Sequence, residues 1–416
     1  MKRIVLLLIV FVTFFSGCGF EKVNEKVDIK YHYTAPWNKD FFDKLYKDIK
    51  IEENLDEIKG GIIPHHLLAG YLDASFFENL KQQNPSTIVI LGPNHFYKGR
   101  GKIISSEYYW HTPYGDLATN NEIIDNLQNK KIVSIEESVI NDEHSIYSIL
   151  PFIKKSLPES QVLPFIFKGD INEEQMDNFV SSLLEVVPFD TVFVSSIDFS
   201  HYQTWSVANF HDELSIDVIK SFDFASLNKL EIDSVPSLYI LLKIMEKNKT
   251  QKMVLEKHDN SAQMIGDMSA DNITSYYSPY FAKGEKTEKS LTSFLLLGDK
   301  ELSDDLAGEE RRFLYGFDFL LAEDNSVKSE EIDYLYNNKF VFDYFDESSK
   351  VKKDFALGVI LYKDKSIKFY LFPYGYKDKE TVRMEYKEAQ NFATDLFAKN
   401  KVKDYNIEEF SFVIKE

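Results

Sequence analysis

The arrangement of apolar and polar positions predicts strands that alternate with helices over most of the chain. Short apolar runs typical of buried strands occupy residues 61–64, 86–91, 161–167 and 191–195. Amphipathic segments typical of helices occupy residues 40–59, 72–83, 121–128, 145–156, 173–185 and 237–247. Strands that alternate with helices predict an α/β fold built around a sheet. Sites in such folds lie just beyond the strand ends, where most of the polar candidate residues of this chain fall.

The end of the chain follows a different pattern. The run at 291–297 (LTSFLLL) predicts a final strand of the first part, and the polar residues 298–312 predict a linker or a helix entry. Further on, residues 355–375 predict a hairpin, residues 382–399 a helix and residues 405–416 a last strand. We therefore expect a small α+β domain at about 305–416, whose role the pattern does not reveal.

Composition and charge exclude several classes of protein. The 416 residues include 48 Lys and Arg against 67 Asp and Glu, which gives a net charge of −19, and 44% of the residues are hydrophobic. This hydrophobic content is enough for folded cores and excludes a wholly disordered chain. The acidic balance argues against a nucleic-acid partner, because phosphate contacts require a basic face. The single cysteine excludes intramolecular disulfides and cysteine-based zinc clusters.

The one cysteine, Cys18, closes a segment typical of export signals. Two positive residues precede an apolar run at 4–15, which at about 1.5 Å per residue is too short to cross a hydrocarbon core of about 30 Å. The ending resembles a bacterial lipoprotein signal, in which the cysteine is acylated and becomes the mature N-terminus; a simple secretory signal with a chance cysteine is the alternative. We expect a signal peptide at 1–17, a tether at 18–40, and an exported protein that a lipid anchors to the bacterial cell membrane, on its periplasmic or cell-surface side.

Five of the nine histidines fall in four loop-like contexts beside other polar residues. They are His65 and His66 in GIIPHHLLAG, His95 in VILGPNHFYKG, His144 in NDEHSIYSILPF and His201 in VSSIDFSHYQTW. A single histidine is more often a structural residue than a ligand. Four comparable contexts favour a shared site, because imidazoles at strand ends converge on one edge of an α/β sheet. The contexts of His32 and His211 predict surface or tether positions instead.

These motifs resemble those of the Memo family, whose bacterial members are often named AmmeMemoRadiSam system protein B. The likeness rests on Pro-His after a first strand, Gly-Pro-Asn-His, Glu-His-Ser-Ile and Ser-Xaa-Asp-Phe-Ser-His in this order, with TPYGDL at 112–117, and it covers roughly residues 58–285. The family is similar in fold to the class III extradiol dioxygenases, which use non-haem iron. The resemblance implies a metal-binding domain at 41–300, with a mostly parallel sheet flanked by helices and a metal pocket on His65, His95 and a third ligand.

The third ligand is where this chain departs from its animal relatives, which carry a cysteine before the helix that follows the Asp-Phe-Ser-His region. That stretch is KLEIDSVPSLYILLKIM here, and counting back from Leu241 and Leu242 places Asp233 at the cysteine position. Two imidazoles and one carboxylate are typical of mononuclear non-haem Fe(II) sites. A thiolate would favour Cu(I) or Zn(II), so we expect Fe(II) first and Zn(II) second, with Cu(I) disfavoured. The alternatives for Asp233 are the N-cap of the helix, since Ser234 and Pro236 follow it, and a carboxylate that only supports the ligands.

Three further residues are candidates for catalytic roles. His201 corresponds to a histidine that acts as a general base near the metal in the dioxygenases, and neutral imidazole suits that role at neutral pH. Asp198 is expected to orient neighbouring groups. His144 lines the pocket, caps the helix that starts at Ser145, or is a buried hydrogen-bonded residue. His66 either adds a ligand or faces away.

Three functions remain open at this stage. The first is a metal-dependent redox enzyme, such as an oxygenase that acts on a small aromatic or peptide-derived substrate. The second is a non-catalytic metal- or peptide-binding protein on the same scaffold, since the animal family members are associated with phosphotyrosine peptides and metal handling. The third is a surface scaffold with a degenerate site, against which the presence of His65, His95 and His201 argues. Bacterial members are linked to a radical enzyme, and export would separate this chain from such cytoplasmic partners.

Overall fold

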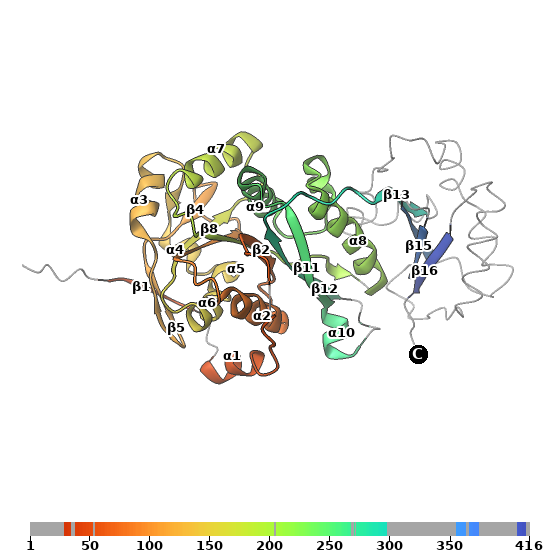
Figure 1. The fold of residues 1–416 in the computed structure, drawn as a ribbon, viewed down its shortest axis with the longest axis horizontal. Coiled ribbons are helices and arrows are strands. Elements are labelled where there is room, and N and C mark those ends of the chain that lie inside the picture. Colours follow the sequence, from red (N-terminus) through yellow and green to blue (C-terminus); the bar gives the residue numbers. More distant parts are fainter. Residues whose placement is uncertain are drawn as a thin grey trace, which may run out of the picture.

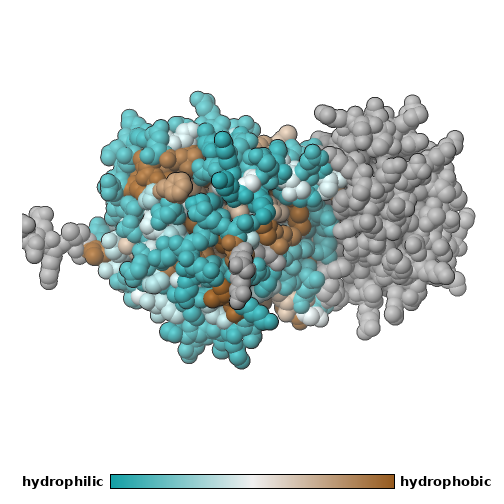
Figure 2. Space-filling view, in the orientation of Figure 1, coloured by the Kyte–Doolittle hydropathy of each residue, from teal (hydrophilic) through white to brown (hydrophobic). Residues whose placement is uncertain are grey.

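The structure is a computed structural model that describes residues 29–297, except 35–37, 53–54, 204, 268–269 and 271, together with three later strands at 355–362, 366–373 and 406–412. The predicted signal peptide, Cys18 and the helix predicted at 382–399 lie outside the described residues. Among the described residues, no helix combines the length and the apolar character needed to cross a membrane. Figure 2 shows hydrophilic side chains over most of the visible face of the described part, in keeping with the charged composition.

Strands and helices alternate along the chain, as Figure 1 shows. The strands are β1 (Tyr31–Tyr33), β2 (Gly60–Ile63), β3 (Thr87–Pro93), β4 (Ile103–Ser105), β5 (Tyr109–Thr112), β6 (Gly115–Leu117), β7 (Ser134–Ile135), β8 (Gln161–Phe167), β9 (Val192–Ser196), β10 (His201–Gln203), β11 (Lys252–Asn260), β12 (Ile273–Ala282), β13 (Leu291–Leu297), β14 (Phe355–Tyr362), β15 (Ser366–Pro373) and β16 (Asn406–Phe412). The helices are α1 (Lys39–Leu45), α2 (Gly70–Leu80), α3 (Asn121–Asn129), α4 (Glu137–Ile140), α5 (His144–Tyr147), α6 (Leu150–Ser156), α7 (Glu173–Leu184), α8 (Trp205–Ser221), α9 (Val235–Asn248) and α10 (Ser261–Ile265), with short 3₁₀ turns η1 (Leu67–Ala69) and η2 (Phe224–Lys229).

The main sheet has the strand order β10-β12-β2-β9-β3-β8-β4-β7, and β11 pairs with β12 off this path. Its centre is parallel, because β2, β9, β3 and β8 run in the same direction. Antiparallel pairs flank this centre, with β12 against β2 on one side and β4 against β8 on the other. The predicted α/β fold is therefore confirmed, and each of the four strands predicted from apolar runs lies in the parallel centre.

Alternate side chains of the central strands enter two separate cores. Val89 and Leu91 of β3 pack in a core with apolar residues of α3, α7, α8 and α9, whereas Ile88 and Ile90 pack in a core with those of α1, α2 and α6. Figure 1 shows α7 and α9 on one side of the sheet and α1 and α2 on the other. Because both faces are covered, the central strands consist of nearly continuous apolar residues, which is why their sequence shows no alternation.

One predicted helix is interrupted by a proline. Residues 145–156 form α5 and α6 instead of one continuous helix, so that prediction is wrong. Pro151 occupies the first turn of α6, where its missing N–H has no consequence. In the interior of a longer helix the same residue would remove a hydrogen bond and clash with the preceding turn. The break leaves His144 at the start of a separate short turn.

The helix predicted at 40–59 is also shorter than expected, because α1 ends at Leu45. The described residues between α1 and β2 lie in turns and irregular structure, and the N–H of Glu52 donates to Oδ1 of Asn79 in α2 (3.0 Å). A side-chain acceptor from a neighbouring helix here takes the place of a helical carbonyl. The local amphipathic pattern cannot reveal such a tertiary partner.

The segment expected to be a tether contains β1, which pairs in parallel with β5. Its His32 is buried, and not exposed as predicted. The ring nitrogens of His32 lie 3.0 Å from Oδ1 of Asn141, 3.1 Å from Oγ of Ser106 and 2.6 Å from Oε2 of Glu137, and the ring packs against Trp110. These three partners therefore tie β1 to α4, to the residue that follows α4 and to the end of β4.

The long helix α8 was not predicted, because polar residues occupy much of its inner face. Asp212, Ser215 and Asp217 are buried there, which weakens the apolar periodicity. The carboxylate of Asp217 accepts hydrogen bonds from the N–H groups of Ser290 (2.8 Å) and Leu291 (3.2 Å). It thereby fixes the start of β13 against α8. His211 on the same helix is buried as well, so its predicted surface position is wrong.

A second sheet is formed by the last strands in the order β13-β14-β15-β16. The strands β14 and β15 pair antiparallel and form the predicted hairpin, and β16 is the predicted last strand, paired in parallel with β15. The run 291–297 is a strand as predicted, but it pairs with β14 and therefore belongs to this second sheet. The domain limits 41–300 and 305–416 stay predictions.

A close approach between β2 and α2 generates the first testable prediction. A Cβ at Gly61 would collide with the ring of Phe76 and lie 3.1 Å from the carbonyl oxygen of Pro279. We expect Gly61→Ala to lower the free energy of unfolding by about 1–3 kcal/mol, measured by urea denaturation, because a packed ring and a backbone oxygen must move. Gly169→Ala is the control, since nothing lies within 4 Å of its Cβ position, and we expect a change within about 0.5 kcal/mol. Equal stability of the two variants would contradict the packing argument.

Candidate metal centre

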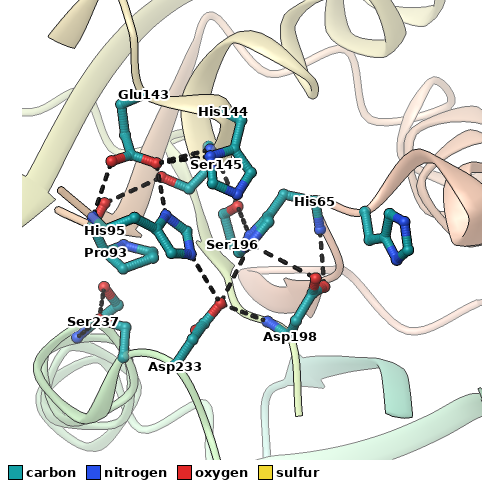
Figure 3. A network of polar contacts seen from close by, with 12 residues as sticks. His65, Pro93, His95, Glu143, His144, Ser145, Ser196, Asp198, Asp233 and Ser237 are labelled. Atoms are coloured by element: carbon teal, nitrogen blue, oxygen red, sulfur yellow. Dashed lines mark hydrogen bonds and ion pairs between the residues drawn. The ribbon is translucent and has the colours of Figure 1, made fainter. Parts of the chain in front are cut away.

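Three polar side chains meet at one edge of the sheet because β2, β9 and β3 are neighbours and run in parallel. His65, Asp198 and His95 each lie two residues beyond the end of their strand. Asp233 reaches the same place from the loop before α9, where Ile232 forms an isolated antiparallel bridge with Phe199. Figure 3 shows these side chains pointing toward one another, with Glu143 and His144 above them.

The ring of His65 is held in one orientation by a serine. Its Nδ1 lies 3.1 Å from Oγ of Ser196, and that hydroxyl donates its own hydrogen to the carbonyl oxygen of Ser145 (2.7 Å). Because the serine hydrogen is already used, Nδ1 of His65 must be the donor. The other nitrogen, Nε2, faces Oδ2 of Asp233 at 3.2 Å.

The ring of His95 is held by a carboxylate in the same way. Its Nδ1 donates to Oε1 of Glu143 (2.7 Å), and its backbone N–H donates to Oε2 of the same residue (2.9 Å). The buried Glu143 also accepts from the N–H of Ser145 and so forms the N-cap of α5. Nε2 of His95 is left facing Oδ2 of Asp233 at 3.6 Å.

The loop that carries His95 is held on both sides. The side-chain amide of Asn94 donates to the carbonyl oxygen of Lys98 (2.8 Å) and accepts from its N–H (3.1 Å). Further along, the carboxylate of Glu136 accepts from the N–H groups of Arg100 and Gly101. The loop is thus bound to its surroundings at both ends, which preorganises the ring of His95.

Asp233 is a strong candidate ligand and not a helix cap. The N-cap of α9 is Ser234, whose side chain accepts from the N–H of Ser237 (3.2 Å). The Oδ2 atom of Asp233 accepts from the N–H of Asp198 (3.2 Å), whereas Oδ1 is buried and has no hydrogen-bond partner among the described residues. A buried carboxylate oxygen without a partner is costly unless a cation satisfies it.

Asp198 links the groups around this carboxylate. Its side chain accepts from the backbone N–H of His65 (3.1 Å), and its backbone N–H donates to Asp233. It therefore fixes the position of the His65 backbone relative to the carboxylate of Asp233. One oxygen of Asp198 lies 3.6 Å from Nε2 of His65.

Mutual electrostatics shift the pKa values of the site in opposite directions. Burial alone would lower the pKa of His65 and His95, but the neighbouring carboxylates outweigh it, so that the pKa of His65 is raised and that of His95 reaches about 10. Burial would raise the pKa of Asp233, yet the two imidazoles hold it below its usual range. A positive charge between these groups is therefore favoured, whether it is carried by protons or by a metal ion.

The distances from Asp233 to the two imidazoles are close to those between two ligands of one divalent metal ion. Two ligand atoms that each lie about 2.1 Å from one ion are about 3.0–3.4 Å apart, close to the 3.2 and 3.6 Å that separate Oδ2 of Asp233 from the two Nε2 atoms. More widely, ligand atoms of His65, His95 and His144 lie within 4.8 Å of one another, as do those of His65, Asp198 and Asp233. The side chains are also arranged as metal ligands usually are, with the second ring nitrogen of each histidine occupied by a protein acceptor.

Two more histidines border this cluster. The ring of His144 stacks on that of His95 with 4.1 Å between centroids, and its pKa is lowered to about 4 by burial and by the imidazoles of His65 and His95. His201 on β10 is close enough for Asp233 and Asp198 to oppose the effect of burial, which still lowers its pKa. Both rings are therefore neutral at neutral pH. The cap of α5 is Glu143, so the cap role considered for His144 is wrong.

The family comparison agrees with this geometry. The model of Memo-like proteins matches residues 31–278, which is more than half of the chain. The chain belongs to the Memo family. A MEMO1 family protein of Nitrosopumilus maritimus is 28% identical over 177 residues, which cover 41% of this chain and 64% of that protein. A MEMO1 family protein of Methanosarcina mazei is 28% identical over 239 residues, which cover 55% of this chain and 87% of the relative.

The resemblance to the Memo family inferred from the histidine motifs is thus confirmed, and the matched segment begins at β1. The alternative of an extra ligand at His66 is not supported, because its Nδ1 lies 2.5 Å from the hydroxyl of Tyr276 and no candidate ligand group among the described residues includes it. Another histidine, His258 on β11, pairs with Asp212 (2.8 Å).

Sequence reasoning missed two residues of this Memo-like site. Glu143 holds the ring of His95 and Ser196 holds that of His65, but in the sequence they stand out only as neighbours of His144 and His201 in their motifs. The sign of a role for Glu143 in the sequence is its position directly before His144, in a chain that carries another histidine, His95, just after a strand. No local signal marks Ser196, since its role depends on the pairing of β9 with β2.

The paired charges of His95 and Glu143 lead to a pH prediction. His95 has a pKa of about 10 in the metal-free protein, so it carries a proton at neutral pH that a metal ion must displace. Metal affinity is therefore expected to fall as the pH is lowered from 9 to 6, which competition with a chromophoric chelator measures. An affinity independent of pH over this range would contradict the assignment.

Asp233 and Glu143 both raise the pKa of His95, and Glu143→Gln tests the contribution of the second carboxylate. We expect the midpoint of the His95 titration, followed by NMR in the metal-free protein, to fall by about 1–3 pH units when the carboxylate is removed. Asp142→Asn removes an adjacent exposed carboxylate that pairs with Lys98, and it should leave the midpoint in place. A similar fall in both variants would show that general charge, and not the direct contact, raises the pKa.

Proposed function

We propose that this Memo family protein binds one divalent metal ion through His65, His95 and Asp233 and uses it in redox chemistry on a small substrate. The observation that carries this proposal is the approach of Oδ2 of Asp233 to Nε2 of both His65 (3.2 Å) and His95 (3.6 Å). The other oxygen of this carboxylate, Oδ1, is buried and lacks a hydrogen-bond partner among the described residues. Two imidazoles and a carboxylate favour Fe(II), with Zn(II) second, and the absence of a thiolate among the donors disfavours Cu(I). The activity itself, a dioxygenase-like oxidation, rests on the resemblance to the extradiol dioxygenases.

A bound Fe(II) ion would supply open positions for oxygen and for a substrate. The chain's own residues would supply the remaining functions. His201, neutral because burial lowers its pKa, would accept a proton from a substrate hydroxyl. Asp198 would keep the backbone of His65 and the carboxylate of Asp233 aligned. Phe96, whose ring meets that of His144, and Tyr202 beside His201 are exposed and would contact an aromatic or peptide-derived substrate.

The backbone at Tyr202 supports a role for this corner. Its φ of 55° lies in the left-handed region, and the pairing of β10 with β12 shifts register between His201 and Gln203. A non-glycine residue in this region is strained, and such strain persists where the surroundings require a particular side-chain direction. The bulge would aim the ring of His201 at the pocket while it leaves the side chain of Tyr202 in solvent.

Metal content is the first test of the proposal. Anaerobically purified protein is expected to contain about one metal ion per chain by elemental analysis, and His65→Ala and Asp233→Ala are expected to lose most of it, because each removes a ligand. His111→Ala is the matched control, since this histidine is exposed on β5 and pairs with Asp116. Full metal occupancy in Asp233→Ala would exclude Asp233 as a ligand.

Oxygen uptake with catechol-type substrates then tests catalysis. His201→Gln should reduce the rate of uptake by about 10²–10⁴ without loss of metal. Uptake with none of these substrates would favour the non-catalytic binding function.

We further propose that the protein is exported and held at the bacterial cell membrane by acylation of Cys18. The support is the order of positive residues, apolar run and small residues before this cysteine. We expect Cys18→Ser to move the protein from the membrane fraction to the soluble fraction, measured by immunoblotting of separated fractions. Ser16→Ala keeps a small residue in the signal and should remain in the membrane. Wild-type protein in the soluble fraction would contradict the proposal.

A further inference from the structure

A third imidazole lies beside the proposed ligands and has no place among them. The ring of His144 is stacked on that of His95 at 4.1 Å and meets the ring of His65 edge-on at 5.1 Å. One nitrogen of each of the three rings lies within 4.8 Å of the others. Nδ1 of His144 is 3.4 Å from Oε1 of Glu143, so Nε2 is the nitrogen available to the cluster.

His144 and Asp233 approach the other two histidines from different sides. In Figure 3 they lie on opposite sides of the pair formed by His65 and His95. Their exposure differs in the same sense, since 37% of the His144 side chain is exposed against 9% for Asp233. The imidazole of His144 is therefore the more solvent-accessible of the two groups, and the carboxylate of Asp233 the more buried.

We infer that the pocket holds a metal ion in either of two ligand sets, which share His65 and His95 and are completed by Asp233 in one case and by His144 in the other. This inference rests on the proposed function and adds a choice between ligands to it. Carboxylate oxygen suits harder ions such as Mn(II) and Fe(II), whereas imidazole suits Zn(II), which accepts three histidines readily. Mn(II) therefore takes the inner set and Zn(II) takes the outer set.

The two ligand sets give one pocket different preferences for Mn(II) and for Zn(II), because the third ligand differs in its chemistry. Asp233 brings a negative charge through Oδ2, which faces both imidazoles and also accepts from the N–H of Asp198. A carboxylate oxygen favours the harder ion. His144 brings a neutral donor already packed against His95, so that little side-chain order has to be gained when it binds.

Metal affinities of four full-length proteins test this inference. Zn(II) and Mn(II) dissociation constants are measured by competition with a chromophoric chelator in wild type, His144→Ala, Asp233→Asn and the control His111→Ala. We expect His144→Ala to weaken Zn(II) binding at least about tenfold and Mn(II) binding less than about threefold, and Asp233→Asn to do the opposite. The control should match wild type for both ions.

X-ray absorption gives a readout that does not depend on affinity. The Zn(II) form of wild type is expected to show three imidazoles and the Mn(II) form two, and His144→Ala should remove one imidazole from the Zn(II) form alone. Equal effects of His144→Ala on the binding of both ions, or no effect on either, would overturn the inference. Thermal unfolding of His144→Ala and of the more conservative His144→Gln checks that the variants are folded. Absence of both metals from wild type would instead overturn the proposed function, so the two failures are distinguishable.

Discussion

The rest of the site depends on the hydrogen bonds that Nδ1 of His65 and Nδ1 of His95 make with fixed acceptors. Ser196 and Glu143 take the Nδ1 hydrogens of His65 and His95, and this leaves both Nε2 atoms facing one carboxylate. Without these acceptors either ring could rotate or change tautomer, and the ligand set would lose its geometry. The buried Asp233 would also be too costly to keep ionised without positive charge beside it.

The main sheet brings the two histidines and their acceptors together. Parallel neighbours β2, β9 and β3 end at one edge, and the covered cores on both faces leave those ends little freedom. The groups of the site come from five places in the fold: the ends of β2, β3 and β9, the start of α5 and the loop before α9. Such a site is stable only when the whole domain is folded, because none of these elements could hold its neighbours alone.

The sequence predicted the central strands and the histidines well, because apolar runs and strand-end motifs are local signals. It failed where polar residues are buried by partners far away in the chain. The local sequence around His32 is typical of a tether, and only the fold brings Asn141, Ser106 and Glu137 to its ring. The buried Asp212 and Asp217 weaken the apolar periodicity of α8, so its sequence does not predict a helix. The ligand set with Asp233 was reached through family resemblance, whereas Ser196 and Glu143 required the three-dimensional pairing.

The partners of His32 also decide how much of the chain makes up one folded unit. A fragment that started at residue 41 would keep every proposed metal ligand and yet lack β1. It would leave a hole beside Trp110 and take away the imidazole that Asn141 and Glu137 contact, on the segment that leads into Glu143. The shortest piece that preserves the support of the centre therefore includes β1, which begins ten residues before the predicted domain limit at 41.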